Sequence, residues 1–266
     1  MKATSRTPGD GHLLIPDIHG HLPRLQAALT VARRFPEAHL IFLGDLIDDS
    51  PRRRTARRDY RERGVADDSR EVLKLVRELQ QQGTASVLLG NHEVLACSAV
   101  LDGDWGMQEI WWRNGGRETA ASYGWRGHGE PGVLAADLQW LREHGRLWLE
   151  VGPEGRKVLA AHATRPHLTR VEEALNRPEH LLPAEDFDPV VWYPLGEDQQ
   201  PPFLHPLPTG FQASVHGHME AAKVRELLGP DQRPAIQLDL HPGRGKVAVL
   251  HLSPAGERQV ILQGIG

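Results

Sequence analysis

The chain has 266 residues with 35 acidic and 31 basic side chains, so its formal net charge is -4 when the 15 histidines are neutral. This near balance argues against a dedicated nucleic-acid binder, and the single cysteine, Cys97, excludes an internal disulfide and a cysteine-rich metal cluster. No apolar run approaches the roughly 20 residues of a membrane helix, and the N-terminus lacks the apolar core of a signal peptide. We expect a cytoplasmic protein of one domain, residues 1–266, that forms no stable nucleic-acid complex and does not associate with membranes.

The first ninety residues repeat one order three times: a short apolar run, a polar turn and a helical stretch. Strands are predicted at 12–16, 39–43 and 84–89. A helix is predicted at 22–34, and another follows Ser69, which is a plausible N-cap. Such alternation predicts a parallel sheet covered by helices.

The rest of the chain is first helical and then rich in strands. Helices are predicted at 116–122 and 133–144. Strands are predicted at 147–151, 157–161, 213–216, 235–240, 246–252 and 259–262. An arginine-rich run at 51–68 and a proline-rich stretch at 182–209 are predicted to be irregular.

Polar side chains follow the predicted strands at the point where each one ends. Ligands of open α/β sheets gather at the carboxyl ends of strands. One such residue can be only a helix cap, but several at equivalent positions favour a shared site. Aspartate, asparagine and histidine without cysteine are ligands typical of Mn, Fe or Zn ions rather than of a thiolate site. The residues are Asp17, His19, Asp45, Asp48, Asn91, His92, His162 and His218.

The order of these motifs resembles that of the calcineurin-like metallophosphoesterases, especially the phosphoprotein-phosphatase branch and its bacterial relatives, which include diadenosine tetraphosphatases. The resemblance rests on Asp17-x-His19-Gly20, Gly44-Asp45-x-x-Asp48, Gly90-Asn91-His92-Glu93, His162 and Gly217-His218. A further stretch, Trp112-x-x-Asn114-Gly115-Gly116-x-x-Thr119-x-x-Ser122-Tyr123, is similar to a segment of the bacterial members. The similarity extends over nearly the whole chain, from about residue 13 to 250.

The resemblance implies an α/β fold of two stacked mixed sheets flanked by helices, with a site for two divalent metal ions. Asp17 and His19 would hold the first ion, and Asp45 would bridge both. The second ion would be held by Asn91, His162 and His218. Two such ions bind a bridging hydroxide that attacks phosphorus, which implies a phosphatase acting on esters or anhydrides. We expect Mn, with Fe or Zn as alternatives.

The resemblance also implies an acid for the leaving group. His92 would protonate the leaving oxygen, and Asp48 would orient its imidazole. The alternative is a phosphate-binding or scaffold protein that keeps the fold without turnover. The presence of both Asp48 and His92 argues against it, because binding alone needs no general acid.

The chain departs from the phosphoprotein-phosphatase branch at arginines that hold phosphate. Asp49 and Leu89 occupy positions where arginine is usual, and 191–194 lacks another. A phosphoprotein and a dinucleoside polyphosphate both remain open as substrates, and the missing arginines favour the nucleotide. Candidate phosphate contacts are Arg165, Arg117 and the run that begins at Arg52. The tryptophans of 105–125 can stack on a base, but their spacing favours core packing.

Overall fold

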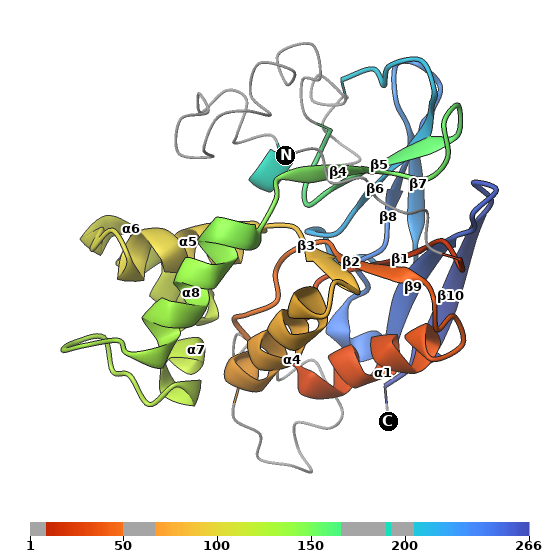
Figure 1. The fold of residues 1–266 in the computed structure, drawn as a ribbon. Helices are drawn as coiled ribbons and strands as arrows, with labels where there is room; N and C mark the ends of the chain where they lie inside the picture. The colour runs from red at the N-terminus through yellow and green to blue at the C-terminus, as the bar shows by residue number, and fades with distance from the viewer. Residues whose placement is uncertain (1–8, 50–66, 166–189, 193–204, 266) are drawn as a thin grey trace.

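The computed structural model describes residues 9–49, 67–165, 190–192 and 205–265, and every structural statement below concerns these ranges. Two mixed five-stranded sheets lie face to face, with helices flanking them (Figure 1). The first sheet has the order β10-β9-β1-β2-β3, and the second has the order β4-β5-β6-β8-β7. The expected fold class is confirmed.

The first sheet is parallel at its centre and antiparallel at one side. β1 pairs in parallel with β2, and β2 with β3, whereas β9 is antiparallel to both β1 and β10. The strands are β1 (His12–Ile15), β2 (His39–Phe42), β3 (Ala85–Val87), β9 (Lys246–Leu252) and β10 (Arg258–Gly264).

The second sheet has parallel strands at its centre and an antiparallel strand at each edge. β5, β6 and β8 run in parallel, while β4 and β7 are antiparallel to their neighbours. The strands are β4 (Trp148–Val151), β5 (Lys157–Ala161), β6 (Phe211–His216), β7 (Arg225–Leu228) and β8 (Pro234–Gln237).

Helices pack on the outer face of the first sheet, where they bury one side of its strands. Figure 1 shows α1 and α4 along this sheet, with α5 to α8 grouped beyond β3. None of the helices in the described ranges is long and apolar enough to cross a membrane. The helices are α1 (Leu22–Ala32), α4 (Ser69–Gln81), α5 (Asn91–Val100), α6 (Trp105–Trp111), the π-helical η1 (Trp112–Gly116), α7 (Arg117–Ser122), α8 (Val133–His144) and the short 3-10 helix η3 (Pro242–Arg244).

The space between the sheets is filled by apolar side chains from both. Leu14, Ile41 and Leu250 of the first sheet pack against Val158 and Val215 of the second. The neighbours of Leu14 in β1 point the other way, into the core beneath the helices. Both faces of the central strands are therefore buried, which explains why their sequences are continuous apolar runs rather than alternating ones.

Two elements were missed by the sequence predictions, and two predictions need correction. Strand β7 was not predicted, because its sequence, Arg-Glu-Leu-Leu, reads as a charged loop and lies at a sheet edge. The helical turns of 105–116 were not predicted either, and Trp105 is 78% exposed rather than packed in the core. Ser69 is the first residue of α4 and Asp68 is its N-cap, so Ser69 does not cap the helix. The arginine-rich run and most of 182–209 lie outside the described residues.

Leu14→Ala should reveal how much the packing between the sheets contributes to stability. Leu14 is fully buried, so truncation removes transfer free energy and leaves a cavity, and we expect the free energy of unfolding to fall by about 2–5 kcal/mol. Urea denaturation measures this. Leu262→Ala on β10, where the side chain is 56% exposed, is the matched control and should change stability by less than about 0.5 kcal/mol. Equal losses in both variants would contradict this account of the core.

Candidate functional site

The polar residues predicted from the sequence converge at the carboxyl ends of the parallel strands. β1, β2 and β3 of the first sheet and β5 and β6 of the second all end at this edge (Figure 1). We call six of these residues the metal-site group: Asp17, His19, Asp45, Asn91, His162 and His218. Asp48 and His92 lie directly beside them.

Asp45 lies at the centre of the metal-site group. Its Oδ2 atom is 3.6 Å from Nε2 of His19 and 3.4 Å from Nε2 of His162. Two sets of potential ligand atoms, each within 4.8 Å of one another, share this carboxylate: His19 with Asp45 and His92, and Asp45 with His162 and His218. A carboxylate has two oxygens that can face different cations, so Asp45 is positioned to serve both sets.

Asn91 and Asp17 join the remaining members. Oδ1 of Asn91 lies 3.1 Å from Nε2 of His162 and 3.0 Å from Nδ1 of His218. Oδ2 of Asp17 lies 3.5 Å from Nε2 of His19, and both Asp17 oxygens accept the backbone N–H of His218 at 3.0 Å. The structure thus brings together all six residues of the metal-site group.

Backbone carbonyls orient two of the imidazoles. Nδ1 of His19 donates to the Ile47 carbonyl at 3.2 Å, and Nδ1 of His162 donates to the Leu43 carbonyl at 2.8 Å. A carbonyl only accepts, so Nδ1 carries a proton in both rings, and Nε2 is the nitrogen that faces Asp45. Such partners fix the tautomer and the ring plane of metal-binding histidines.

Glu93 holds the loop after β2 against the start of α5. Its buried carboxylate accepts the backbone N–H groups of Asp45 and Leu46 at 2.8 Å and that of Gly90 at 2.9 Å. Burial, with the negative charge of Asp45, raises the pKa of Glu93 to about 7 in spite of these bonds. Sequence reasoning quoted Glu93 in a motif but did not assign it this role.

The backbone is in the left-handed region at four of the polar residues: His19, Asp45, Asp48 and His218 have φ between 49° and 72°. This region is uncommon for residues with a Cβ atom and is typical of functional sites. Two neighbouring glycines are required by close approach. A Cβ atom would lie 2.1 Å from Oδ1 of Asp45 if placed on Gly90, and 2.0 Å from Oδ1 of Asp17 if placed on Gly217.

The metal-site group is electrostatically matched to cations. Burial alone would raise the pKa of Asp45, but the charges of His162 and His92 outweigh it and hold the pKa well below its usual range. Burial alone would lower the pKa of His162, but the Asp45 carboxylate outweighs it and raises the pKa to about 10. Three oxygen ligands, three imidazoles and a potential that favours positive charge fit divalent metal ions.

Asp48 and His92 form a hydrogen-bonded pair beside the metal-site group. Oδ2 of Asp48 is 2.8 Å from Nδ1 of His92, and Nε2 of His92 lies 3.9 Å from Oδ2 of Asp45. Asp48 is fully buried, and this burial raises its pKa although several hydrogen bonds oppose the shift. Two of these bonds come from Trp111 and Thr119, for which the sequence analysis assigned no role at Asp48.

Two of the arginines expected to contact phosphate, Arg165 and Arg117, are described by the structure, and both have protein partners. The Arg165 guanidinium is buried and donates to Ser214 Oγ, Asp231 Oδ1 and the carbonyls of Arg233 and His205, so all three of its nitrogens are engaged. This corrects its predicted role: Arg165 stabilises the second sheet. Arg117 is exposed on α7 and its guanidinium lies over the Trp112 ring, 4.4 Å from the centroid. Arg52 lies outside the described residues.

His216 is also buried, and both of its nitrogens are engaged by protein groups. Nδ1 lies 3.1 Å from the Ala161 carbonyl and Nε2 lies 2.8 Å from Ser214 Oγ. It therefore supports the second sheet beneath His162 and His218.

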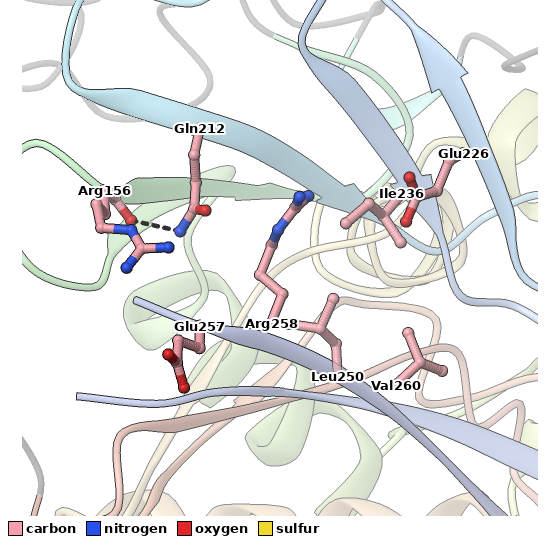
Figure 2. Close-up of a pocket in the computed structure, with 8 residues that line it drawn as sticks. All are labelled: Arg156, Gln212, Glu226, Ile236, Leu250, Glu257, Arg258 and Val260. Atoms are coloured by element: carbon pink, nitrogen blue, oxygen red, sulfur yellow. Dashed lines mark hydrogen bonds between the residues drawn. The ribbon is translucent and has the colours of Figure 1, made fainter. Parts of the chain in front are cut away.

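A hollow of about 380 Å³ lies at a different place, between β9 and β10 of the first sheet and β6 to β8 of the second. Figure 2 shows the Arg258 side chain extending among the lining residues, with Arg156 and Gln212 on one side and Ile236 and Glu226 on the other. No member of the metal-site group is among the described residues that line it. The chemistry expected of this chain is therefore not located in this hollow.

Two stacked mixed sheets carry aspartates, histidines and an asparagine at their strand ends, where these side chains could hold metal ions. The family profile of the calcineurin-like phosphoesterases matches residues 13–194, and the chain belongs to this family. Members normally bind divalent metals, and the Asp and His groups described here can hold them.

Solved structures with this fold have low sequence identity. A proposed diadenosine tetraphosphatase is 19% identical with a TM-score of 0.53, covering 97% of this chain and 96% of its own. A serine/threonine phosphatase from Saccharomyces cerevisiae, similar to human phosphatase PP5, is 14% identical with a TM-score of 0.56. The match covers 97% of this chain and 81% of the phosphatase. A protein from Pyrococcus horikoshii is 11% identical with a TM-score of 0.57, and the match covers 96% of this chain and 88% of that protein. No curated protein matches the chain in sequence.

Asp45→Asn should reduce metal binding more than a surface change of the same kind. The amide keeps one oxygen but replaces the other by a nitrogen that donates hydrogen bonds and cannot bind a cation. We expect bound Mn²⁺ per chain, measured by elemental analysis after dialysis, to fall by at least about half, because Asp45 belongs to both sets of ligands. Asp102→Asn, at an exposed ion pair with Arg142, is the control. Unchanged metal content in Asp45→Asn would contradict a shared carboxylate.

Proposed function

We propose that this protein hydrolyses phosphate esters or anhydrides with two divalent metal ions held by the metal-site group. The observation that supports this most directly is the single carboxylate of Asp45, shared by two sets of ligands and lying beside the Asp48–His92 pair. When bound, such ions activate water as a nucleophile and neutralise the phosphoryl oxygens. We propose Mn²⁺ for both positions, with Fe or Zn as alternatives.

The Asp48–His92 pair provides the acid for the leaving group. Asp48 accepts a hydrogen bond from the Nδ1–H group of His92, so the proton on Nε2 of the charged ring is directed toward the metal-site group. Water would lose one proton to the solvent and form the new bond to phosphorus, the bond to the leaving oxygen would break, and that oxygen would take the Nε2 proton. His92 would then regain a proton from the solvent. The Asp48 carboxylate stabilises the imidazolium before transfer and keeps the ring in one orientation. No covalent phosphoenzyme is required.

The alternative, a protein that binds phosphate without turnover, explains the metal-site group but not this pair. Asp48 is a buried carboxylate aimed at an imidazole. Burying such a pair is costly, and cations can hold a phosphate without it.

The substrate class follows from the positions of the arginines. Asp49 replaces an arginine, and Arg165 is engaged in the second sheet, so a small phosphomonoester would be held mainly by the metals. A polyphosphate can also reach basic groups farther away. We therefore propose a nucleotide polyphosphate in preference to a phosphopeptide.

This preference is tested by measuring turnover in the presence of Mn²⁺ for four substrates: diadenosine polyphosphates, phosphopeptides, p-nitrophenyl phosphate and its bis ester. Faster turnover of phosphopeptides at equal concentration would refute the preference, and no turnover of any would refute the enzyme.

His92→Asn should separate proton donation from metal binding. If His92 acts as the acid, kcat should fall by roughly 100- to 10,000-fold for phenyl phosphate, with a smaller loss for p-nitrophenyl phosphate, whose leaving group needs less protonation. Metal content should stay at the wild-type value, in contrast to Asp45→Asn. Because His92 also lies within one of the two ligand sets, a loss of metal or an equal loss of kcat on both esters would show that it is a ligand instead.

A further inference from the structure

The stretch from Trp111 to Thr119 has no role in the mechanism described so far, although its sequence resembles a segment of bacterial relatives. It covers the last residue of α6, all of η1 and the first turn of α7. Two of its side chains, Trp111 and Thr119, are fully buried and reach the same carboxylate, that of Asp48.

The contacts leave the Asp48 carboxylate little freedom to rotate. Trp111 Nε1 donates to Oδ2 at 2.8 Å and to Oδ1 at 3.0 Å, which fixes one side of the carboxylate plane. Thr119 Oγ1 donates to Oδ1 at 2.6 Å, and Nδ1 of His92 lies 2.8 Å from Oδ2. The two oxygens are therefore distinguished: one is held by the threonine hydroxyl and the other is presented to the histidine.

The direction of the threonine hydrogen bond follows from counting its protons. Thr119 has one hydroxyl proton, and the nearest acceptor is Oδ1 of Asp48 at 2.6 Å, whereas Oδ2 of Asp67 is 3.5 Å away. The Thr119 oxygen then accepts the Asp48 backbone N–H at 3.0 Å and the hydroxyl of Ser69 at 3.0 Å. Thr119 thus bonds both the backbone and the side chain of Asp48, whose φ of 72° needs such support.

The two glycines of the stretch allow this close approach. A Cβ atom on Gly116 would lie 2.4 Å from the Trp111 ring. Gly115 has a φ of 112°, and a Cβ atom there would lie 3.0 Å from both the backbone carbon and the Cβ atom of Asp48. Asn114-Gly115-Gly116 is therefore a turn that packs the backbone against Asp48 and leaves room for the indole.

We propose that Trp111 and Thr119 are positioning residues that hold the Asp48 carboxylate in the orientation in which it orders His92 for proton donation. This inference rests on the function proposed above, because it gives the two residues an effect on the leaving-group step. In the described residues, Trp111 and Thr119 direct their shortest hydrogen bonds to the Asp48 carboxylate, so they would act on His92 through Asp48.

Thr119→Val and Thr119→Ser form a matched pair for testing this. Valine has nearly the same shape without the hydroxyl, and serine restores the hydroxyl without the methyl group. We expect kcat of Thr119→Val for phenyl phosphate to fall by about 10- to 100-fold, the range seen when a supporting hydrogen bond is lost, with a smaller fall for p-nitrophenyl phosphate. KM should stay within about twofold, and Thr119→Ser should recover most of the rate. Equal losses on both esters, or a serine variant as slow as the valine variant, would overturn the proposal.

A double-mutant cycle tests whether Thr119 acts through Asp48. In an Asp48→Asn background, Thr119→Val should cause no further loss of kcat, because the carboxylate that it positions is gone. If the double variant loses kcat by the product of the two single-variant factors, the two residues act independently and the proposal is overturned. Trp111→Phe removes the indole N–H that donates to Asp48 and keeps an aromatic ring. It should also lower kcat in the wild-type background and not in the Asp48→Asn background, and it replaces Thr119→Val in this test if that variant does not fold.

Proton NMR of the Zn²⁺-loaded protein separates this inference from the proposed function. The Nδ1 proton of His92 should give a downfield resonance that is absent in Asp48→Asn, shifted or broadened in Thr119→Val and restored in Thr119→Ser. The same resonance in wild type and Thr119→Val would overturn the proposal whatever the activity. If the resonance responds as expected while wild type hydrolyses no phosphate compound, the positioning contact is supported and the proposed function fails.

Discussion

The site depends on one buried carboxylate, that of Glu93, which ties the loop after β2 to the beginning of α5. It accepts hydrogen bonds from the backbone N–H groups of Asp45, Leu46 and Gly90. These bonds fix the left-handed turn at Asp45 relative to the helix that begins with Asn91 and His92. The backbone N–H of His92 in turn donates to Oδ1 of Asp45 at 3.1 Å. The Glu93 hydrogen bonds and the His92 bond together set the separation between the central carboxylate and the residues at the helix start. Buried carboxylates that accept several backbone amides commonly set such geometry.

The residues at strand ends could be predicted from sequence, because parallel strands place successive loops at one edge whatever the details of packing. Asp17, Asp45 and Asn91 needed only the alternation of strands and helices to be brought together. Trp111 and Thr119 could not be predicted, since 63 and 71 residues separate them from Asp48 and an indole or a hydroxyl alone indicates no partner. The charged edge strand β7 was missed for a related reason: its pairing with β8, rather than its own sequence, makes it a strand.

Arg165 shows the limit of reasoning from proximity in sequence. It follows His162 by three residues, yet its guanidinium lies over the second sheet, where Ser214, Asp231 and two carbonyls satisfy it. A buried arginine needs several acceptors to offset its lost hydration. Ser214 of β6 and the neighbouring residues His205, Asp231 and Arg233 supply them. The position of the Arg165 guanidinium is thus set by the acceptors that a buried charge needs, and not by its closeness to His162 in the sequence.

The central carboxylate also links the two sheets, which share an apolar core and a few hydrogen bonds near the site. Asp17, Asp45 and Asn91 extend from the first sheet, whereas His162 and His218 extend from the second, across the core that contains Leu14 and Val215. A cation bound among them would act as a removable cross-link between the sheets, so ligand binding and the docking of the two sheets are thermodynamically coupled. An ion present at one hundred times its dissociation constant adds about 2.7 kcal/mol to the stability of the folded state. Metal supply would then govern how long the folded chain persists as well as its chemistry.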